Sequence, residues 1–427
     1  MRTRLPLIAV TVALVTYHLV SFGRNRIGLN PYRIDLDVYR IGSLVWLRGG
    51  NLYGALPRTS AGIRLPFSYP PVAAAVLSPL AVVPMAVAGF ALTLASIALT
   101  WFVLRVFTRS LSSRLGLWWL LPAALELEPV RATLNFGQVN IALMALVALD
   151  CLHPEPRWPR GALVGLAAAV KLTPAAFILF FLIRNDRRAA STAAVSFATV
   201  TGTGFILDWH DSVRYWTSVV FQTSRPGSPA SVSNQALSGV LARAGLDPHS
   251  QGGSAAWLAL SVAVVVVAVI GMRRALATGE PAWALSVNAL AALLISPISW
   301  SHHWVWAAPA LMCLAVTGRR HSWRGGVAAA WAGLVLFEVP PMWLLPHSGT
   351  AGELGWAWSE QVIADTYVIF GVVVLVLAAR FTPGHGGQPR PRPHHRPCTA
   401  ARHPASGKPS AAPRTRRHEP LTSPARR

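Results

Sequence analysis

The chain has 427 residues, of which 53% are hydrophobic and 13% are charged, and its mean hydropathy is +0.44. Soluble domains carry about 25% charged residues, so this composition excludes an ordinary water-soluble enzyme and indicates a protein embedded in a lipid bilayer. The three cysteines, Cys151, Cys313 and Cys398, lie far apart without a CxxC pair, and they indicate neither a disulfide framework nor a thiolate metal site.

Apolar segments recur along the chain at about the length that a membrane-spanning helix needs, roughly 20 residues. They cover residues 5–22, 84–106, 115–128, 137–152, 161–183, 189–207, 254–272, 282–298, 303–317, 325–345 and 362–380. This pattern predicts an all-α, polytopic membrane protein with about ten to twelve transmembrane helices, some of them broken or re-entrant. The first segment follows Arg2 and Arg4 without a small-residue cleavage site, so we expect it to remain as the first span.

Clusters of basic residues predict the orientation of these helices, because Lys and Arg accumulate in cytoplasmic loops. Arginines group at 2–4, 105–109, 157–160, 184–188, 273–274 and 319–324, which we therefore expect on the cytoplasmic side. Segment 161–183 would then have two cytoplasmic flanks, so we expect a broken, re-entrant hairpin at Lys171–Pro174. The loops at 23–68, 208–253 and 299–303 are expected to face the outside.

The last residues, 382–427, hold ten Arg or Lys and one acid, Glu419, among many prolines. A segment of this kind has no core-forming pattern, so we expect a disordered, cytoplasmic tail after a catalytic membrane domain at 1–381. Its charge suits anionic headgroups or nucleic acid. The positive-inside rule favours membrane lipids, and we expect no nucleic-acid partner.

Two carboxylates, Asp35 and Asp37, lie two residues apart in the outer loop 23–68, which also holds seven arginines. A carboxylate near a membrane surface is costly to desolvate and is a candidate general base for a sugar hydroxyl. Ordinary loop acids paired with Arg33 or Arg40 explain the pattern equally well. So many arginines on an outer loop oppose the positive-inside trend, which suggests that the loop binds phosphate.

Further along, polar side chains interrupt the apolar segments. Tyr69 precedes two prolines that open a helix, and it is either an interface anchor or a sugar-stacking ring. The amides of Gln138 and Asn140, next to a glycine, would either bind sugar hydroxyls or join helices. Lys171 is the one lysine before the tail. It either pairs with a lipid-linked phosphate or snorkels to the cytoplasmic face.

Adjacent histidines, His302 and His303, follow Trp300 at the start of another apolar segment. They lack the i,i+4 spacing of helical metal ligands and have no acidic cluster around them. We therefore expect contacts to phosphate and sugar rather than zinc, with no metal and no cofactor. The alternative is a solvated helix end with an aromatic belt.

Seven motifs in this order resemble one family of glycosyltransferases. They are Asp35-Leu-x-Val-Tyr39, Phe67-x-Tyr-Pro-Pro71, Glu128-Pro-Val-Arg131, Gly137-Gln-Val-Asn140, Lys171-x-Thr-Pro174, Asn234-Gln235 and Ser296-Pro-x-Ser-Trp-x-His-His303. Over about residues 5–380 the chain resembles the GT-C glycosyltransferases of the actinobacterial family GT87. Its members include polyprenol-phosphate-mannose-dependent α-1,2-mannosyltransferases of phosphatidylinositol mannoside, lipomannan and lipoarabinomannan synthesis.

The resemblance implies a polyprenyl-phosphate-mannose donor, a glycolipid acceptor, chemistry on the outer face of the cell membrane, and inversion at the anomeric carbon. The family's catalytic aspartate falls on Asp35, with Asp37 as second choice. His302, His303 and an arginine of the first loop are expected to hold the leaving phosphate. The other substrate- or phosphate-binding positions are Lys171, Arg131, Tyr69, Gln138, Asn140, Asn234, Gln235 and Trp300.

Other functions compete with a hexosyltransferase that makes an α-1,2 mannose bond. Within the family the alternative is an arabinofuranosyltransferase using decaprenyl-phosphate-arabinose. Outside it the alternatives are a transporter or flippase for lipid-linked sugar, weakened by the lack of a visible internal repeat, and a membrane scaffold. The acceptor is either a small phosphatidylinositol mannoside or a long mannan, and the residues favour neither.

Overall fold

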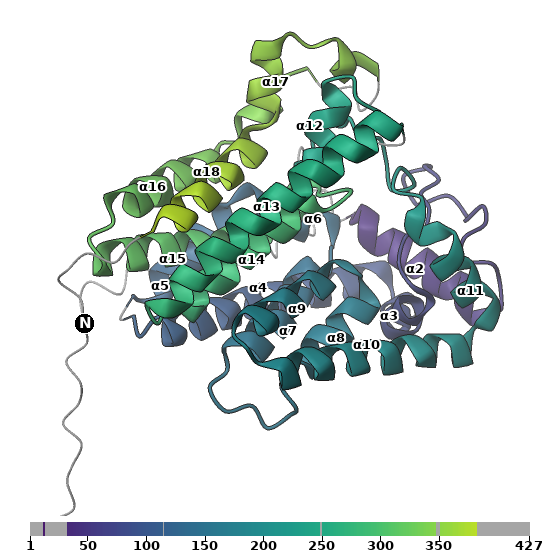
Figure 1. Cartoon of the computed structure of the whole chain (residues 1–427). Helices are drawn as coiled ribbons and strands as arrows, with labels where there is room; N and C mark the ends of the chain where they lie inside the picture. The colour runs from purple at the N-terminus through teal and green to yellow at the C-terminus, as the bar shows by residue number, and fades with distance from the viewer. Residues whose placement is uncertain (1–11, 13–31, 114, 248–249, 347–350, 382–427) are drawn as a thin grey trace, which may run out of the picture. The chain divides into compact units, whose positions relative to one another are not determined.

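A computed structural model describes residues 12, 32–113, 115–247, 250–346 and 351–381 of the chain. Within those ranges the regular structure is helical (Figure 1), and the β-type contact is a single antiparallel bridge between Asn234 and Trp300. The predicted all-α class is therefore confirmed. The expected first span 5–22, apart from residue 12, and the expected tail 382–427 lie outside the described residues, so both stay predictions.

The described helices are joined by connections that range from a single residue, Leu127, to the loop 48–70. The α-helices are α2 (Ile34–Leu47), α3 (Pro71–Val82), α4 (Met85–Ser110), α5 (Leu117–Glu126), α6 (Glu128–Phe136), α7 (Asn140–Leu152), α8 (Ala162–Val170), α9 (Ile178–Ile183), α10 (Arg187–Leu207), α11 (Trp209–Thr217), α12 (Leu237–Arg243), α13 (Gln251–Ala277), α14 (Pro281–Ile295), α15 (Ala307–Arg320), α16 (Arg324–Glu338), α17 (Trp358–Ala364) and α18 (Thr366–Arg380). The 3-10 turns are η1 (Thr173–Phe177), η2 (Val219–Phe221), η3 (Ser301–Trp306), η4 (Pro341–Leu344) and η5 (Ala351–Gly355).

Fewer helices are long enough to cross a bilayer than the sequence predicts. Among the described residues, four helical segments are both long and apolar enough: Met85–Ser110, Arg187–Leu207, Gln251–Ala277 and Arg324–Leu344. The pair α17 and α18, bent by 69°, makes a possible fifth. The chain is thus a polytopic helical membrane protein, and in this part of it several of the predicted apolar segments form shorter or interrupted helices, as expected for broken spans.

The difference arises because several apolar segments break within their length. Gly137 separates α6 from α7 with a left-handed backbone, φ +70°. Lys171 ends α8 in an extended conformation, and Pro174 lies at the start of the 3-10 turn that follows. Ser296, before a proline, ends α14. The predicted break of segment 161–183 at Lys171 is confirmed, and each of these breaks brings polar side chains into an apolar surrounding.

The region 23–68, predicted as a loop, contains the helix α2 at Ile34–Leu47. Ser43 Oγ donates a hydrogen bond to the carbonyl of Ala74, 2.9 Å away, which joins α2 to α3. Arg40 donates to the carbonyls of Leu80 and Val83 at the other end of α3. The missed helix carries charged residues and lacks a long apolar stretch, so hydropathy alone does not reveal it.

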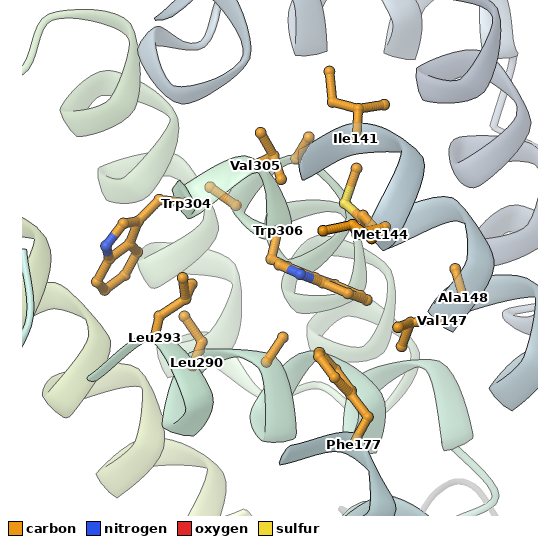
Figure 2. Close-up of a cluster of buried hydrophobic side chains, with 14 of the residues drawn as sticks. Ile141, Met144, Val147, Ala148, Phe177, Leu290, Leu293, Trp304, Val305 and Trp306 are labelled. Atoms are coloured by element: carbon orange, nitrogen blue, oxygen red, sulfur yellow. The ribbon is translucent and has the colours of Figure 1, made fainter. Parts of the chain in front are cut away.

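A cluster of large apolar side chains packs around the turn η3 and includes its residues Trp304 and Trp306 (Figure 2). The indole of Trp306 stacks on Phe177 with ring centroids 4.8 Å apart and an interplanar angle of 28°. Met144 and Val147 of α7 and Leu293 of α14 surround the pair in the same cluster. Burial of this many aromatic and branched side chains gives η3 a rigid support. The polar residues that precede Trp306 are therefore held in fixed positions.

Gly137→Ala should destabilise the protein, because the added Cβ would lie 2.9 Å from the Cβ atoms of both Arg33 and Leu36 at a left-handed φ. The left-handed conformation alone costs a non-glycine residue roughly 1–2 kcal/mol. Gly202→Ala in α10 is the matched control, since no atom lies within 4 Å of its added Cβ. Thermal unfolding in detergent should show a lower melting temperature for Gly137→Ala alone; equal melting of both variants and wild type would contradict this description of the break.

Candidate active site

A cavity of about 460 Å³ collects residues from both halves of the chain. This volume falls within the roughly 300–1,000 Å³ typical of small-molecule sites. Seven of the predicted site residues line it: Asp35, Tyr69, Gln138, Lys171, Trp300, His302 and His303. A smaller cavity of about 60 Å³ adjoins the same region and is lined by Asn140, Lys171 and His303 among others. The breaks in the apolar segments thus meet around one space.

Asp35 is oriented by an amide whose own direction is fixed. Gln138 Nε2 donates to Asp35 Oδ2 at 2.8 Å. The oxygen of the same amide, Oε1, accepts from the hydroxyls of Tyr39 at 2.5 Å and Tyr69 at 3.2 Å. Because an ionised carboxylate only accepts hydrogen bonds, the amide nitrogen must face Asp35 and the amide oxygen must face the two hydroxyls. The carboxylate of Asp35 is therefore held in one orientation at the wall of the cavity.

Burial raises the pKa of Asp35 from 3.8 to about 6, while the hydrogen bond from Gln138 and the charge of Lys171 act in the opposite direction. A general base works best when its pKa lies near the operating pH. Asp35 at neutral pH is thus ionised and considerably more basic than an exposed aspartate. These are the properties required of a group that removes a proton from a sugar hydroxyl.

Asp37, the second candidate base, has a different environment. Its Oδ2 accepts from the hydroxyl of Tyr32 at 3.0 Å and from the backbone N–H of Ser60 at 2.7 Å. Its side chain is buried, and it is absent from the lining of the large cavity. Asp37 thus connects residues on both sides of α2, and Asp35 is the one of the two carboxylates that lines the cavity.

Lys171 provides a positive charge next to Asp35. Its Nζ donates to Asn140 Oδ1 at 2.9 Å, lies 3.3 Å from His303 Nε2, and is 5.4 Å from the centroid of the Tyr69 ring. An ammonium group is only a donor, so Nε2 of His303 accepts in this contact and the imidazole is neutral. The positive charge at this point therefore belongs to Lys171, whose amine lies at the cavity.

His302 is held by its backbone and presents its ring to the cavity. Its carbonyl accepts from Thr133 Oγ1 at 2.7 Å and from Asn140 Nδ2 at 3.0 Å. The side chain is 7% exposed, and its Nε2 has no hydrogen-bond partner among the described residues. A buried polar atom without a partner is costly unless a ligand or water satisfies it. His302 is consequently positioned to hydrogen-bond a bound substrate.

Glu128 does not line the cavity, but its carboxylate holds the segment that contains His302. Its carboxylate accepts from Ser301 Oγ at 2.9 Å, from the hydroxyl of Tyr367 at 2.8 Å and from Trp343 Nε1 at 3.3 Å. Three donors from separate segments meet at one buried acid. They fix the residue that directly precedes His302, so the position of the histidine depends on α18 as well as on α6.

Three predicted ligand-binding residues lie outside the cavity lining and have protein partners instead. Arg131 is 3.5 Å from Glu126 and 3.8 Å from Glu338. Asn234 is fully buried and its Oδ1 accepts from the backbone N–H of Ser299 at 2.9 Å. Gln235 is buried likewise. These contacts connect helices, and the expected role of the three residues in ligand binding stays a prediction.

Gln235 illustrates how complete this internal bonding is. Its amide donates to the carbonyls of Ala364 at 2.6 Å and Val232 at 2.7 Å, and accepts from the N–H of Tyr367 at 3.2 Å. The amide joins the loop before α12 to the bend between α17 and α18. An amide with all these partners has little capacity left for a substrate hydroxyl.

Comparison with known proteins decides the family. The model of glycosyltransferase family 87 matches residues 67–297, which include Tyr69, Gln138 and Lys171. This protein belongs to glycosyltransferase family 87. The GT87 match begins after Asp35 and ends before the histidine pair, so it covers neither of those two parts of the site. No solved structure matches the chain.

Curated relatives extend over most of the GT87 chain. A polyprenol-phosphate-mannose-dependent alpha-(1-2)-phosphatidylinositol mannoside mannosyltransferase of Mycobacterium tuberculosis (strain ATCC 25618 / H37Rv) is 41% identical, covering 83% of this chain and 88% of the relative. A protein of the same description from Mycolicibacterium smegmatis (strain ATCC 700084 / mc(2)155) is 38% identical over 87% and 90%. A polyprenol-phosphate-mannose-dependent alpha-(1-2)-phosphatidylinositol pentamannoside mannosyltransferase of Mycobacterium tuberculosis (strain CDC 1551 / Oshkosh) is 32% identical over 78% and 79%.

The cavity of this GT87 glycosyltransferase also contains residues that the sequence analysis did not select. Tyr39 belongs to a matched motif, but its hydroxyl acts on the amide of Gln138 rather than on a ligand. Trp257 of α13, Tyr215 of α11 and Arg225 line the same cavity. The sequence around these three residues does not identify them as site residues, because single aromatic and arginine side chains have many structural uses. Their place becomes visible only when the helices are packed.

The two aspartates should separate in single-turnover measurements on purified variants. Asp35→Asn removes the base and should lower the rate about a hundred- to ten-thousand-fold. Asp37→Asn should keep most of the rate per folded molecule and lower the melting temperature, because it weakens the contacts to Tyr32 and Ser60. A dead Asp37→Asn beside an active Asp35→Asn would contradict the assignment.

Stability gives an independent check on Asp35. The folded-state pKa of about 6 is raised from 3.8, so the folded protein binds the proton more tightly than the unfolded chain. Any contribution of this group to stability is present below pH 3.8 and is lost as the pH rises through 6. Asp35→Asn should therefore melt at or above the wild-type temperature at pH 7; a marked decrease would show that the ionised carboxylate is a structural anchor.

Proposed function

We propose that this GT87 enzyme transfers mannose from polyprenyl-phosphate-mannose to the 2-hydroxyl of a mannose on a phosphatidylinositol mannoside or mannan acceptor, forming an α-1,2 bond. The observation that carries the proposal is the cavity in which one oriented carboxylate, Asp35, lies near one cation, Lys171, and one unpartnered imidazole nitrogen, on His302. The names of the 38–41% identical relatives supply the donor and acceptor classes.

In the proposed reaction, Asp35 takes the proton from the acceptor 2-hydroxyl as the oxygen attacks the anomeric carbon of the donor. The bond from that carbon to the phosphate oxygen breaks, and the phosphate leaves with the electron pair. Attack opposite to the leaving group inverts the configuration. Lys171 and His302 lie where they would stabilise the charge that grows on the phosphate.

The walls of the cavity suit a lipid-linked sugar. The cavity lining includes polar side chains, among them Asp35 and Gln138, together with the apolar side chains of Leu172, Val220, Trp257 and Ile295. An apolar lining beside a few convergent polar groups is typical of sites for amphiphilic ligands. The polyprenyl chain would bind along the apolar part, with its phosphate and sugar directed to the polar end.

The distribution of arginine supports an outward-facing site. Helix α13 contributes Trp257 to the cavity near its beginning and carries Arg273 and Arg274 near its end. Helix α14 contributes Ile295, its last residue. Since basic clusters accumulate on the cytoplasmic side, the end of α13 that carries the arginines is expected inside and the cavity outside. A lipid carrier is the appropriate donor on that face.

The decisive experiment uses purified protein in proteoliposomes, labelled mannose on polyprenyl phosphate, and a phosphatidylinositol mannoside acceptor. We expect labelled product that an α-1,2-specific mannosidase cleaves, and none with Asp35→Asn. Exclusive transfer from decaprenyl-phosphate-arabinose in a parallel reaction would show that the transferred sugar is arabinose and not mannose. Movement of the intact donor lipid across the bilayer without any sugar transfer would contradict the enzymatic function and indicate a flippase.

A further inference from the structure

Arg225 is held rigidly at the wall of the large cavity, in the connection between η2 and α12. Its Nε donates to the carbonyl of Phe67 at 3.3 Å and its Nη2 to the carbonyl of Tyr53 at 3.2 Å. The guanidinium carbon lies 5.8 Å from the centroid of the Tyr53 ring. These contacts fix the plane of the group, and none of them uses Nη1, so the guanidinium keeps donors for another partner.

The charge of Arg225 is not balanced by an acid. No described carboxylate lies within ion-pair distance of it. Burial and the like charge of Arg214 lower its pKa, and Tyr53 raises it. A half-buried cation with fixed geometry, no counter-ion and spare donors is suited to an anion, and guanidinium groups match phosphate oxygens especially well.

Two arginines of the first loop have backbone carbonyls as partners. Arg40 donates to two carbonyls at the end of α3, and Arg58 donates to the carbonyl of Gly62. Among the described residues, Arg225 is the one arginine that lines the large cavity. This arginine belongs to the second predicted outer loop, at 208–253.

Arg225 and Lys171 are separate positive sites in the same cavity. Lys171 contacts Asn140 and His303, whereas Arg225 is bound to the carbonyls of Phe67 and Tyr53, so the two cations share no hydrogen-bond partner. The charge of Lys171 acts on Asp35. In a glycosyl donor the phosphate is bonded to the reacting carbon, so it must lie within one sugar of Asp35, at the Lys171 end. The acceptor of the proposed function carries its phosphate farther away, beyond a mannose and an inositol ring.

We propose that Arg225 binds the phosphodiester of an anionic glycolipid acceptor, and so selects acceptors that carry a lipid phosphate near the mannose to be extended. The proposal rests on the proposed function, since it assigns the second phosphate of that reaction. It also favours a small phosphatidylinositol mannoside over a long mannan, whose lipid phosphate lies many sugars from the growing end.

The test compares an anionic acceptor, phosphatidylinositol mannoside, with a neutral one, an alkyl α-mannoside, at fixed donor concentration. Arg225→Gln should raise KM for the anionic acceptor about ten-fold or more, in line with the loss of a hydrogen bond to a charged group. The KM for the neutral acceptor and the KM for the donor should not change. Arg225→Lys should give an intermediate KM for the anionic acceptor, because lysine keeps the positive charge but cannot form the paired hydrogen bonds of a guanidinium. Arg58→Gln, an exposed arginine that does not line the cavity, is the matched control.

Equilibrium binding of phosphatidylinositol mannoside without donor gives a readout besides activity. Arg225→Gln should weaken this binding. High salt should reduce the difference in affinity between the variant and wild type. A rise in the donor KM with both acceptors would show that Arg225 binds the donor phosphate and would overturn the proposal. Unchanged KM and binding in a folded variant would overturn it as well. Absence of transfer by wild type with both acceptors would instead overturn the proposed function, which distinguishes the two failures.

Discussion

A helix that breaks inside an apolar layer leaves backbone N–H and C=O groups without water to bind them, so other parts of the protein must satisfy those groups. The active site of this glycosyltransferase is built on that constraint. The carbonyl of His302 receives hydrogen bonds from Thr133 and Asn140, and the N–H of Ser299 is bound by Asn234. Each broken segment is thereby tied to another one. The polar residues that accompany the breaks are collected around one cavity as a consequence.

The same constraint explains why structural and ligand-binding amides look alike in the sequence. Asn140 bonds both the backbone of His302 and the amine of Lys171, so it supports two site residues while lying beside the larger cavity. Gln138 orients Asp35, whereas Gln235 lies outside the cavity lining and connects helices. All of these amides lie in apolar surroundings, and only their partners in space separate the roles.

The sequence predicts the class of fold and a large part of the site, for reasons that are visible in particular residues. Asp35, Lys171 and the histidine pair stand out because charged or titratable groups are costly in an apolar chain. The choice between Asp35 and Asp37 cannot be made from spacing, since it depends on the hydroxyl of Tyr32 and the N–H of Ser60. Arg225 has no pattern around it. The number of full-length helices is overestimated because hydropathy records an apolar segment without showing the point at which its helix ends.

The central claim is that Gln138 holds Asp35 as the general base of the reaction. The most direct measurement is the pH dependence of the single-turnover rate for wild type and Gln138→Ala, with saturating donor and acceptor. The wild-type rate should fall below about pH 6, where Asp35 becomes protonated. In Gln138→Ala this decrease in rate should occur at higher pH, because the carboxylate of Asp35 loses a hydrogen bond that stabilises its charge. A wild-type rate that stays constant from pH 5 to pH 7, or a decrease that occurs at the same pH in the variant, would contradict the account.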